Sequence, residues 1–157
     1  MQALAGIVDR SNGPFYAKVL ALVLRLMEVE EAAVRDEVVK ACPALMAKGD
    51  LRAIRTLLQA AHAHAPGTRQ AALQVLPRVS ALDNPDVMSA VLLRMRDSDW
   101  AVRREAACAC RGLASAMDER VMTGLSFLLE DPEAHVREAA KQSLAALRKA
   151  ERDAMLA

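Results

Sequence analysis

Aromatic residues are scarce in this sequence, and neither sign of charge is in clear excess. Phenylalanine, tyrosine and tryptophan make up 3% of the 157 residues, and 21 basic residues against 20 acidic ones leave a net charge of +1. A non-specific nucleic-acid binder needs a basic surface, and proteins that hold single strands stack the bases on aromatic rings. We therefore expect no nucleic-acid partner.

Long apolar runs are missing as well. The longest candidate, residues 19–29, contains Arg25 and Glu28, whereas a transmembrane helix needs about 20 predominantly apolar residues in succession. The first residues also lack the basic stretch and cleavage site of a secretory signal. The sequence thus predicts no membrane insertion and an intracellular, most simply cytoplasmic, protein.

Cysteine and histidine are few and poorly placed for chemistry. The cysteines number three, an odd count that argues against a disulfide framework. Cys108 and Cys110 point about 200° apart on a helix, so they cannot both ligate one metal ion. His62, His64 and His135 belong to no His-Glu or Glu-x-x-His pair. We expect no metal site, no cofactor and no catalytic residue.

The residues that are abundant favour helices. Hydrophobic residues make up 54% of the chain and charged residues 26%, with alanine and leucine prominent among them. This mixture favours helix over sheet, and a chain of this length can bury a substantial core as one domain. The composition predicts an all-α fold.

An arginine recurs at a constant interval along the chain. The dipeptides that contain it are Val34-Arg35, Thr68-Arg69, Val102-Arg103 and Val136-Arg137, and we call these four arginines the arginine ladder. Apolar residues share this repeat period, and within one repeat they are spaced three and four apart, as on one face of a helix. The three rows are Leu20, Ile54, Met88, Met122; Val23, Leu57, Val91, Leu125; and Met27, Ala61, Met95, Leu129.

The same period marks where helices begin. Asp50, Asn84 and Asp118 are good N-cap residues at the start of a first helix in each repeat, and Pro85 follows Asn84 where proline is best tolerated. Asp97 and Asp131 are aligned at the start of the second helix, where we expect them to act as caps. Core positions of that second helix are Cys42, Leu76, Cys110, Leu144 and Leu45, Val79, Leu113, Leu147.

The segments DSDWAVRREAACACRGL and DPEAHVREAAKQSLAAL, residues 97–113 and 131–147, resemble the second half of HEAT repeats. In that family an acidic turn is followed by Val-Arg, then alanine, then leucine at helical spacing. The tetratricopeptide family shares this repeat period of about 34 residues, but its Trp, Leu-Gly, Tyr and terminal Pro pattern is absent. The resemblance implies a single domain, 1–157, folded as a right-handed α-solenoid of about four stacked helix pairs.

The expected helix pairs are 15–49, 50–83, 84–116 and 117–150. An additional N-terminal helix is expected at 2–10, where Leu4 and Val8 fall in register with later second helices, and a helical tail at 148–157. Solenoid ends expose core-type surface unless they are capped. The ends are therefore where we expect a homo-oligomer or a larger complex to form.

The resemblance implies a non-enzymatic interaction module, a scaffold, an adaptor or a subunit of a larger assembly. HEAT proteins hold protein or peptide partners along the concave face of their second helices. Projected onto this chain, the polar positions on that face are the candidate partner-binding residues, with one aromatic residue in the turn before them. They are Asp36, Lys40, Gln70, Gln74, Trp100, Arg104, Cys108, Glu138 and Gln142.

The arginine ladder allows two interpretations. Its guanidinium groups can bind acidic groups of a partner, or they can tie the repeats together through aspartates and carbonyls. Because Asp97 and Asp131 lie close in sequence to Arg103 and Arg137, we expect the structural role. The alternative to a binding module is an enzyme on HEAT-like repeats, such as a phycobilin lyase or a DNA alkylation glycosylase.

Overall fold

The computed structural model describes residues 13–115 and 118–156, which form eight α-helices and no strand. The all-helical fold predicted from the sequence is confirmed. The helix expected at 2–10 lies outside the described residues. The helices are α2 (Pro14–Met27), α3 (Ala32–Leu45), α4 (Leu51–Ala61), α5 (Pro66–Val79), α6 (Pro85–Arg94), α7 (Trp100–Leu113), α8 (Glu119–Leu128) and α9 (Ala134–Met155).

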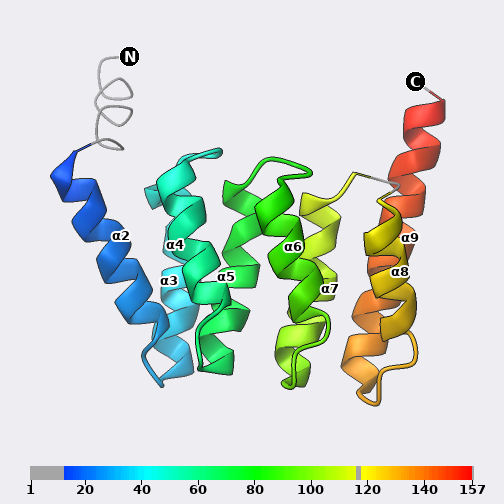
Figure 1. The fold of residues 1–157 in the computed structure, drawn as a ribbon, viewed down its shortest axis with the longest axis horizontal. Coiled ribbons are helices and arrows are strands. Elements are labelled where there is room, and N and C mark those ends of the chain that lie inside the picture. The colour runs from blue at the N-terminus through cyan, green and yellow to red at the C-terminus, as the bar shows by residue number, and fades with distance from the viewer. Residues whose placement is uncertain (1–12, 116–117, 157) are drawn as a thin grey trace.

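The helices alternate between two rows (Figure 1). We call α2, α4, α6 and α8 the first helices and α3, α5, α7 and α9 the second helices. Each first helix packs against the second helix that follows it, and the pairs stack side by side along the chain. This arrangement is a HEAT-like helical solenoid. The last helix is a single unbroken element, so residues 148–155 of the predicted tail continue α9.

The N-caps predicted for the first helices are confirmed. Asp50 accepts hydrogen bonds from the backbone N–H groups of Arg52 and Ala53. Asn84 and Asp118 cap α6 and α8 in the same way. Gly13 at the N-cap position of α2 cannot make such a bond, and the Tyr16 hydroxyl in that helix donates a hydrogen bond to Asp50 in the next repeat. Burial and this bond raise the pKa of Tyr16 above its usual range.

The core follows the apolar rows of the sequence. All members of the three first-helix rows are buried except Met122 and Leu129, which are half-buried. The second-helix rows are buried too, with one exception: Leu45 is 46% exposed, so its predicted place in the core is wrong. No second helix precedes α3 in the described chain to cover that side chain.

The second helices pack more closely than the first helices do. The contacts of α5 with α7 and of α7 with α9 are the most extensive in the described chain, whereas α4, α6 and α8 touch one another little. A Cβ atom added at Gly112 of α7 would lie 3.0 Å from the Cβ of Pro77 of α5, so the absent side chain permits this approach. The second helices therefore form a tightly packed row, whereas gaps separate neighbouring first helices.

The turns between repeats carry a second periodic contact. Gly49 and Asp83, at equivalent positions of successive repeats, both have positive φ angles, of 84° and 54°. Their backbone N–H groups donate to the last-turn carbonyls of Val79 and Leu113, each at 2.7 Å. The Asp83 carboxylate also accepts a 2.7 Å hydrogen bond from the N–H of Ser115. Each turn thereby ties its repeat to the next one.

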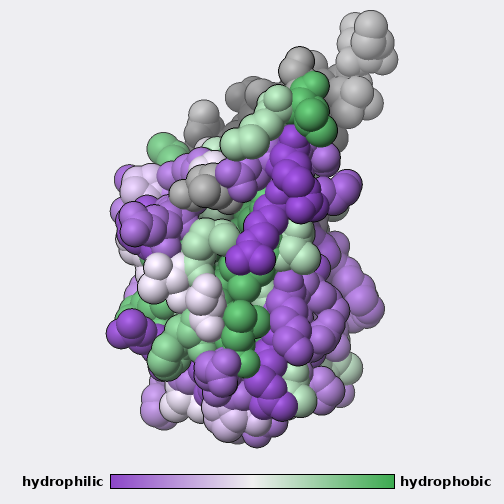
Figure 2. Space-filling model, turned by 90° about the vertical axis from the view of Figure 1, so that its right-hand side faces the viewer, coloured by the Kyte–Doolittle hydropathy of each residue, from purple (hydrophilic) through white to green (hydrophobic). Residues whose placement is uncertain are grey.

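Figure 2 shows the molecule from the end formed by α8 and α9, where hydrophilic side chains flank a narrow hydrophobic stripe. In the described residues, no helix is both long and apolar enough to cross a bilayer.

Candidate functional site

The arginine ladder makes contacts within and between repeats. Arg69 donates through Nε and Nη2 to the two carboxylate oxygens of Asp97, at 2.9 and 2.6 Å. Its Nη1 donates to the carbonyls of Ala63 and His64 in the turn of its own repeat. Both charged side chains are at least nine-tenths covered. A buried two-bonded pair of this kind fixes the relative position of two repeats.

The next repeat has the same geometry. Arg103 donates to both carboxylate oxygens of Asp131, at 2.7 and 2.9 Å, and to the carbonyls of Asp97 and Ser98. The outer members of the ladder make fewer contacts. Within the described chain, Arg35 and Arg137 bind only carbonyls of their own turns, those of Val29 and Glu30 and those of Asp131 and Pro132.

The two aspartates are not the helix caps that the sequence suggested. Asp99 caps α7, accepting from the N–H groups of Ala101 and Val102. Glu133 occupies the N-cap position of α9 without a side-chain bond. Asp97 and Asp131 lie two residues before these N-cap positions. Each aspartate accepts a hydrogen bond from the backbone N–H of the N-cap residue, and each also binds an arginine of the preceding repeat.

These contacts hold both carboxylates in their ionised form. Burial opposes ionisation of Asp97, but the hydrogen bonds from Arg69, Asp99 and Arg94 outweigh it, and the pKa of Asp97 lies below its ordinary value. The hydrogen bond from Arg103 likewise lowers the pKa of Asp131. The aspartates are thus structural partners of the ladder.

The predicted partner-binding residues are spread unevenly over the second-helix face. Asp36, Lys40, Glu138 and Gln142 are exposed, on the outer second helices α3 and α9. Gln70, Gln74, Arg104 and Cys108 are half-buried, on α5 and α7. Because α5 and α7 are covered by second helices on both sides, their polar side chains lie closer together.

A small polar cluster forms at the centre of this face. Gln74 and Arg104 both donate to the same carboxylate oxygen of Glu105, each at 3.2 Å. Glu105 was not among the residues predicted from the sequence. The Nε of Arg104 is buried and has no hydrogen-bond partner within the described residues. The cluster therefore leaves one strong donor unused.

The cysteines are unsuited to nucleophilic chemistry. Burial raises the pKa of Cys42 to about 11 and that of Cys110 to about 12. Burial and the nearby charge of Glu105 also raise the pKa of Cys108, the half-buried thiol. A thiolate is the reactive form of cysteine, so all three side chains are poor nucleophiles near neutral pH.

Trp100 is the first residue of α7, one helical turn before Arg104. Its ring stacks at a tilt on His135, the second residue of α9, with centroids 5.7 Å apart. The side chain remains 41% exposed. The ring thus connects α7 to α9 and remains partly accessible to solvent.

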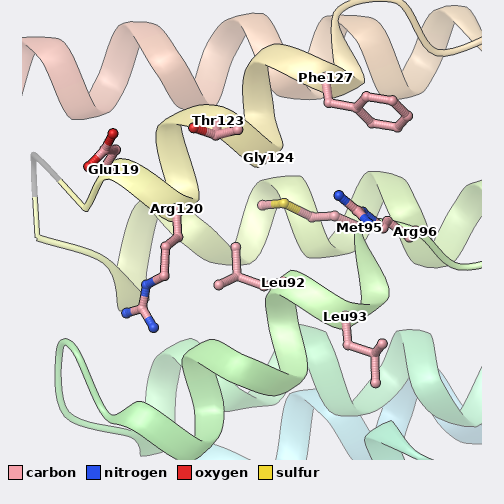
Figure 3. A pocket seen from close by; sticks show the side chains of 9 residues that line it. All are labelled: Leu92, Leu93, Met95, Arg96, Glu119, Arg120, Thr123, Gly124 and Phe127. Atoms are coloured by element: carbon pink, nitrogen blue, oxygen red, sulfur yellow. The ribbon is translucent and has the colours of Figure 1, made fainter.

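A groove that the sequence analysis did not predict lies between the first helices α6 and α8 (Figure 3). We call it the first-helix groove. Its volume is about 720 Å³, and most of its surface is apolar. Its lining residues are Leu92, Leu93, Met95, Arg96, Glu119, Arg120, Thr123, Gly124 and Phe127.

Two features shape this groove. Leu93 and Phe127 are 50% and 66% exposed at one end of it. At its floor, Met95 extends towards Gly124, and a Cβ atom added at Gly124 would lie 2.6 Å from the Met95 sulfur. Any larger residue than glycine would therefore push Met95 away from α8.

The groove carries charge at both ends. Glu119 and Arg120 lie at the end opposite Phe127, where Arg120 pairs with Asp118 at 2.8 Å. Arg96 lies beside Phe127 and is exposed, with no ion pair to any described residue. The groove thus combines an apolar floor, an aromatic rim and an unpaired cation.

The sequence does contain a signal for the groove. Leu93 and Phe127 occupy equivalent positions of successive repeats, and the earlier repeats have Arg25 and Gln59 there. An apolar pair at a position that is polar elsewhere marks a repeat-specific surface. The wide separation of α6 and α8, which turns that pair into a groove, is visible only in the fold.

A metal centre has no candidate here: no group of three or more His, Cys, Asp or Glu side chains is placed to hold one in the described ranges. Comparison with known families identifies one repeat. Residues 80–106 match the family described as a HEAT repeat associated with sister chromatid cohesion, a span that includes α6 and the first half of α7. No curated protein matches the chain significantly.

Proposed function

We propose that this chain, a solenoid of HEAT-like repeats, is a non-enzymatic interaction module that binds a protein or peptide partner. HEAT repeats generally mediate protein–protein interaction, and the matched repeat lies at the centre of the array. The inner arginines of the ladder have a structural role rather than a catalytic one, because Arg69 binds Asp97 and Arg103 binds Asp131. We accordingly propose no catalytic residue.

The observation that carries the proposal is the first-helix groove. Exposed aromatic and aliphatic side chains beside an apolar depression are typical of the anchor points of protein interfaces. Leu93 and Phe127 are such side chains, and both are at least half exposed. An amphipathic helix of the partner fits this shape, because helices commonly place an apolar face in a groove between two others.

The charge at the aromatic end specifies the partner further. Arg96 lies next to Phe127 and forms no ion pair with any described residue. An acidic residue at the edge of the partner's apolar face would form an ion pair with it. The pair would lie at the rim, where such contacts contribute more to orientation than to affinity. The partner segment is therefore an amphipathic helix with an acidic flank.

The second-helix face is a second candidate surface. It is favoured by the Arg104 side chain, which is 38% exposed, and by the exposed polar residues of α3 and α9. A partner carboxylate could pair with the exposed part of the Arg104 guanidinium group. Contact there would use the residues predicted from the sequence.

Site-specific photocrosslinking in cells distinguishes the two surfaces. A photoreactive residue is placed at Phe127, at Arg104 or at the exposed Lys48 as a control, and adducts are identified by mass spectrometry. We expect a discrete protein adduct from Phe127 and none from Lys48. An adduct from Arg104 alone moves the binding site to the second helices. A copurifying tetrapyrrole, or the absence of any adduct at both test sites, contradicts the proposal.

A further inference from the structure

We propose that residues 2–10 of this chain cover the exposed end of the second-helix row by packing against α3. This inference concerns the end of the solenoid and is independent of the proposed binding groove. It starts from a comparison of α3 with the other second helices, which occupy the same register.

No described residue covers the side of α3 that faces away from α5. Ala41 is exposed there, whereas the residues at its register in α5, α7 and α9, which are Val75, Ala109 and Ser143, are 0%, 3% and 0% exposed. Leu45 is likewise 46% exposed, while Val79, Leu113 and Leu147 at its register are at most 3% exposed. The same positions are thus core in three helices and surface in the first.

Contacts within the array show what normally covers these positions. Ser143 of α9 donates a 2.8 Å hydrogen bond to the carbonyl of Ala107 in α7, so this register position contacts the preceding second helix. Gly112 meets Pro77 of the preceding α5 in the same way. What α3 lacks, within the described chain, is therefore a preceding second helix.

The uncovered surface is a shallow apolar depression, which we call the N-terminal end face. Its only charged lining residue is Glu37. Its lining residues are Leu26, Ala33, Val34, Glu37, Val38 and Ala41. Covering an apolar surface of this kind is favourable because it removes the surface from water.

Residues 2–10 have the sequence that this position requires. Leu4 lies one repeat period before Val38, and Val8 lies one repeat period before Cys42, and both of those later residues are buried. The register also places Ala5 opposite Ala41, as Ala107 lies opposite Ser143, so the segment would lie over the half of α3 that contains Val38, Ala41 and Leu45. Small residues at both positions permit a close approach.

The connection to α2 is long enough. Residues 11–13 separate the segment from Pro14, the first residue of α2, and helix–helix connections of about 2 to 8 residues are common. Because the segment is tethered beside the end face, its effective concentration there is high, on the order of millimolar. A covalently attached segment therefore outcompetes a dilute external partner of similar affinity.

The opposite end of the array differs at the corresponding surface. Val39, Leu73 and Ala107 are buried against the second helix that follows them, and α9 has the exposed Lys141 at that register. The charged residues on that end are consistent with Figure 2, where hydrophilic side chains border the hydrophobic stripe. Of the two ends of the described second-helix row, the N-terminal one thus presents apolar residues at the positions where a further second helix would pack.

Thiol labelling of the full chain tests the proposal. Ala41→Cys places a reactive thiol on the end face, and Ala146→Cys places one on the exposed surface of α9 as a reference. Labelling rates are measured site by site by mass spectrometry, so that the native cysteines do not interfere. We expect the Ala41→Cys thiol to react about tenfold or more slowly than the reference thiol, because it reacts only when the segment detaches.

Two substitutions in the segment complete the design. Leu4→Asp with Val8→Asp should raise the labelling rate at position 41 about tenfold, because charged residues would face the end face. The matched control is Gln2→Asp with Gly6→Asp, in register with the exposed Asp36 and Lys40 of α3, and it should leave the rate unchanged. Circular dichroism checks that each variant keeps its helix content.

Two results overturn the proposal. One is labelling at position 41 that is as fast as the reference or that does not respond to Leu4→Asp with Val8→Asp. The other is protection that disappears on dilution together with a dimer detected by light scattering. That second outcome assigns the end face to a second copy of the chain.

Discussion

Arg103 and Asp131, which are 28 residues apart, form a two-bonded ion pair that joins α7 to the turn before α9. Arg69 and Asp97 form the same pair one repeat earlier, also 28 residues apart. The recurrence of this pair at an identical separation shows that repeats are joined by a periodic polar contact as well as by the apolar core. Stability of the array should therefore depend on these four side chains.

Replacing Arg103 tests this dependence. Arg103→Ala leaves the carboxylate of Asp131 buried without its partner, and breaking a buried ion pair costs about 3 kcal/mol or more. The matched control is Arg35→Ala, because Arg35 binds two backbone carbonyls of its own turn and should cost about 1 kcal/mol. Urea denaturation followed by circular dichroism measures both free energies of unfolding. Equal losses in the two variants would show that the inter-repeat pair contributes nothing.

The same pairs predict an acid-sensitive stability. The pKa values of Asp97 and Asp131 are lower in the folded protein than in the unfolded chain. Their contribution is therefore fully present above the unfolded pKa and is lost as the pH falls through the folded pKa. We expect the free energy of unfolding to fall from about pH 4 downwards, the region where aspartates titrate. In Asp131→Asn the fall should be shallower, and an unchanged pH profile would contradict the assignment.

Asp83, in the turn between the second and third repeats, is the subject of a third prediction. Its φ of 54° is unfavourable for a side chain, and its carboxylate receives the Ser115 N–H. Asp83→Ala keeps the unfavourable conformation and loses the acceptor, so it should cost about 1 to 2 kcal/mol. Asp83→Gly relieves the backbone while losing the same bond, so it should cost less. Thermal denaturation ranks the two, and a glycine variant less stable than the alanine variant would exclude this explanation.

The helix caps and the buried apolar rows of each repeat could be predicted from the sequence, because both depend on spacing within one repeat. Asp50, Asn84 and Asp118 cap helices as expected, because a cap is a local contact within three residues. The apolar rows are buried for the same reason of regular spacing. Local chemistry repeated at a fixed interval is what sequence analysis detects best.

Features that depend on a neighbouring repeat were harder to predict. Asp97 and Asp99 are both good cap residues two positions apart. In the fold Asp99 caps α7, while Asp97 binds Arg69 of the preceding repeat and Arg94 of its own. Leu45 has the pattern of a core residue but lacks, in the described chain, the helix that would cover it. The groove beside Phe127 depends on the separation of α6 from α8, which no single repeat determines.

The most direct test of the proposed function is the dissociation constant of the partner captured at Phe127, measured by isothermal titration calorimetry. Phe127→Glu places a charge in the exposed apolar rim, and Arg104→Glu makes a matched change on the second-helix face. Loss of an aromatic anchor commonly costs about 2 kcal/mol, so we expect binding weakened roughly thirtyfold by Phe127→Glu and nearly unchanged by Arg104→Glu. Unchanged binding by the Phe127→Glu variant, with helix content preserved, would contradict the proposed function.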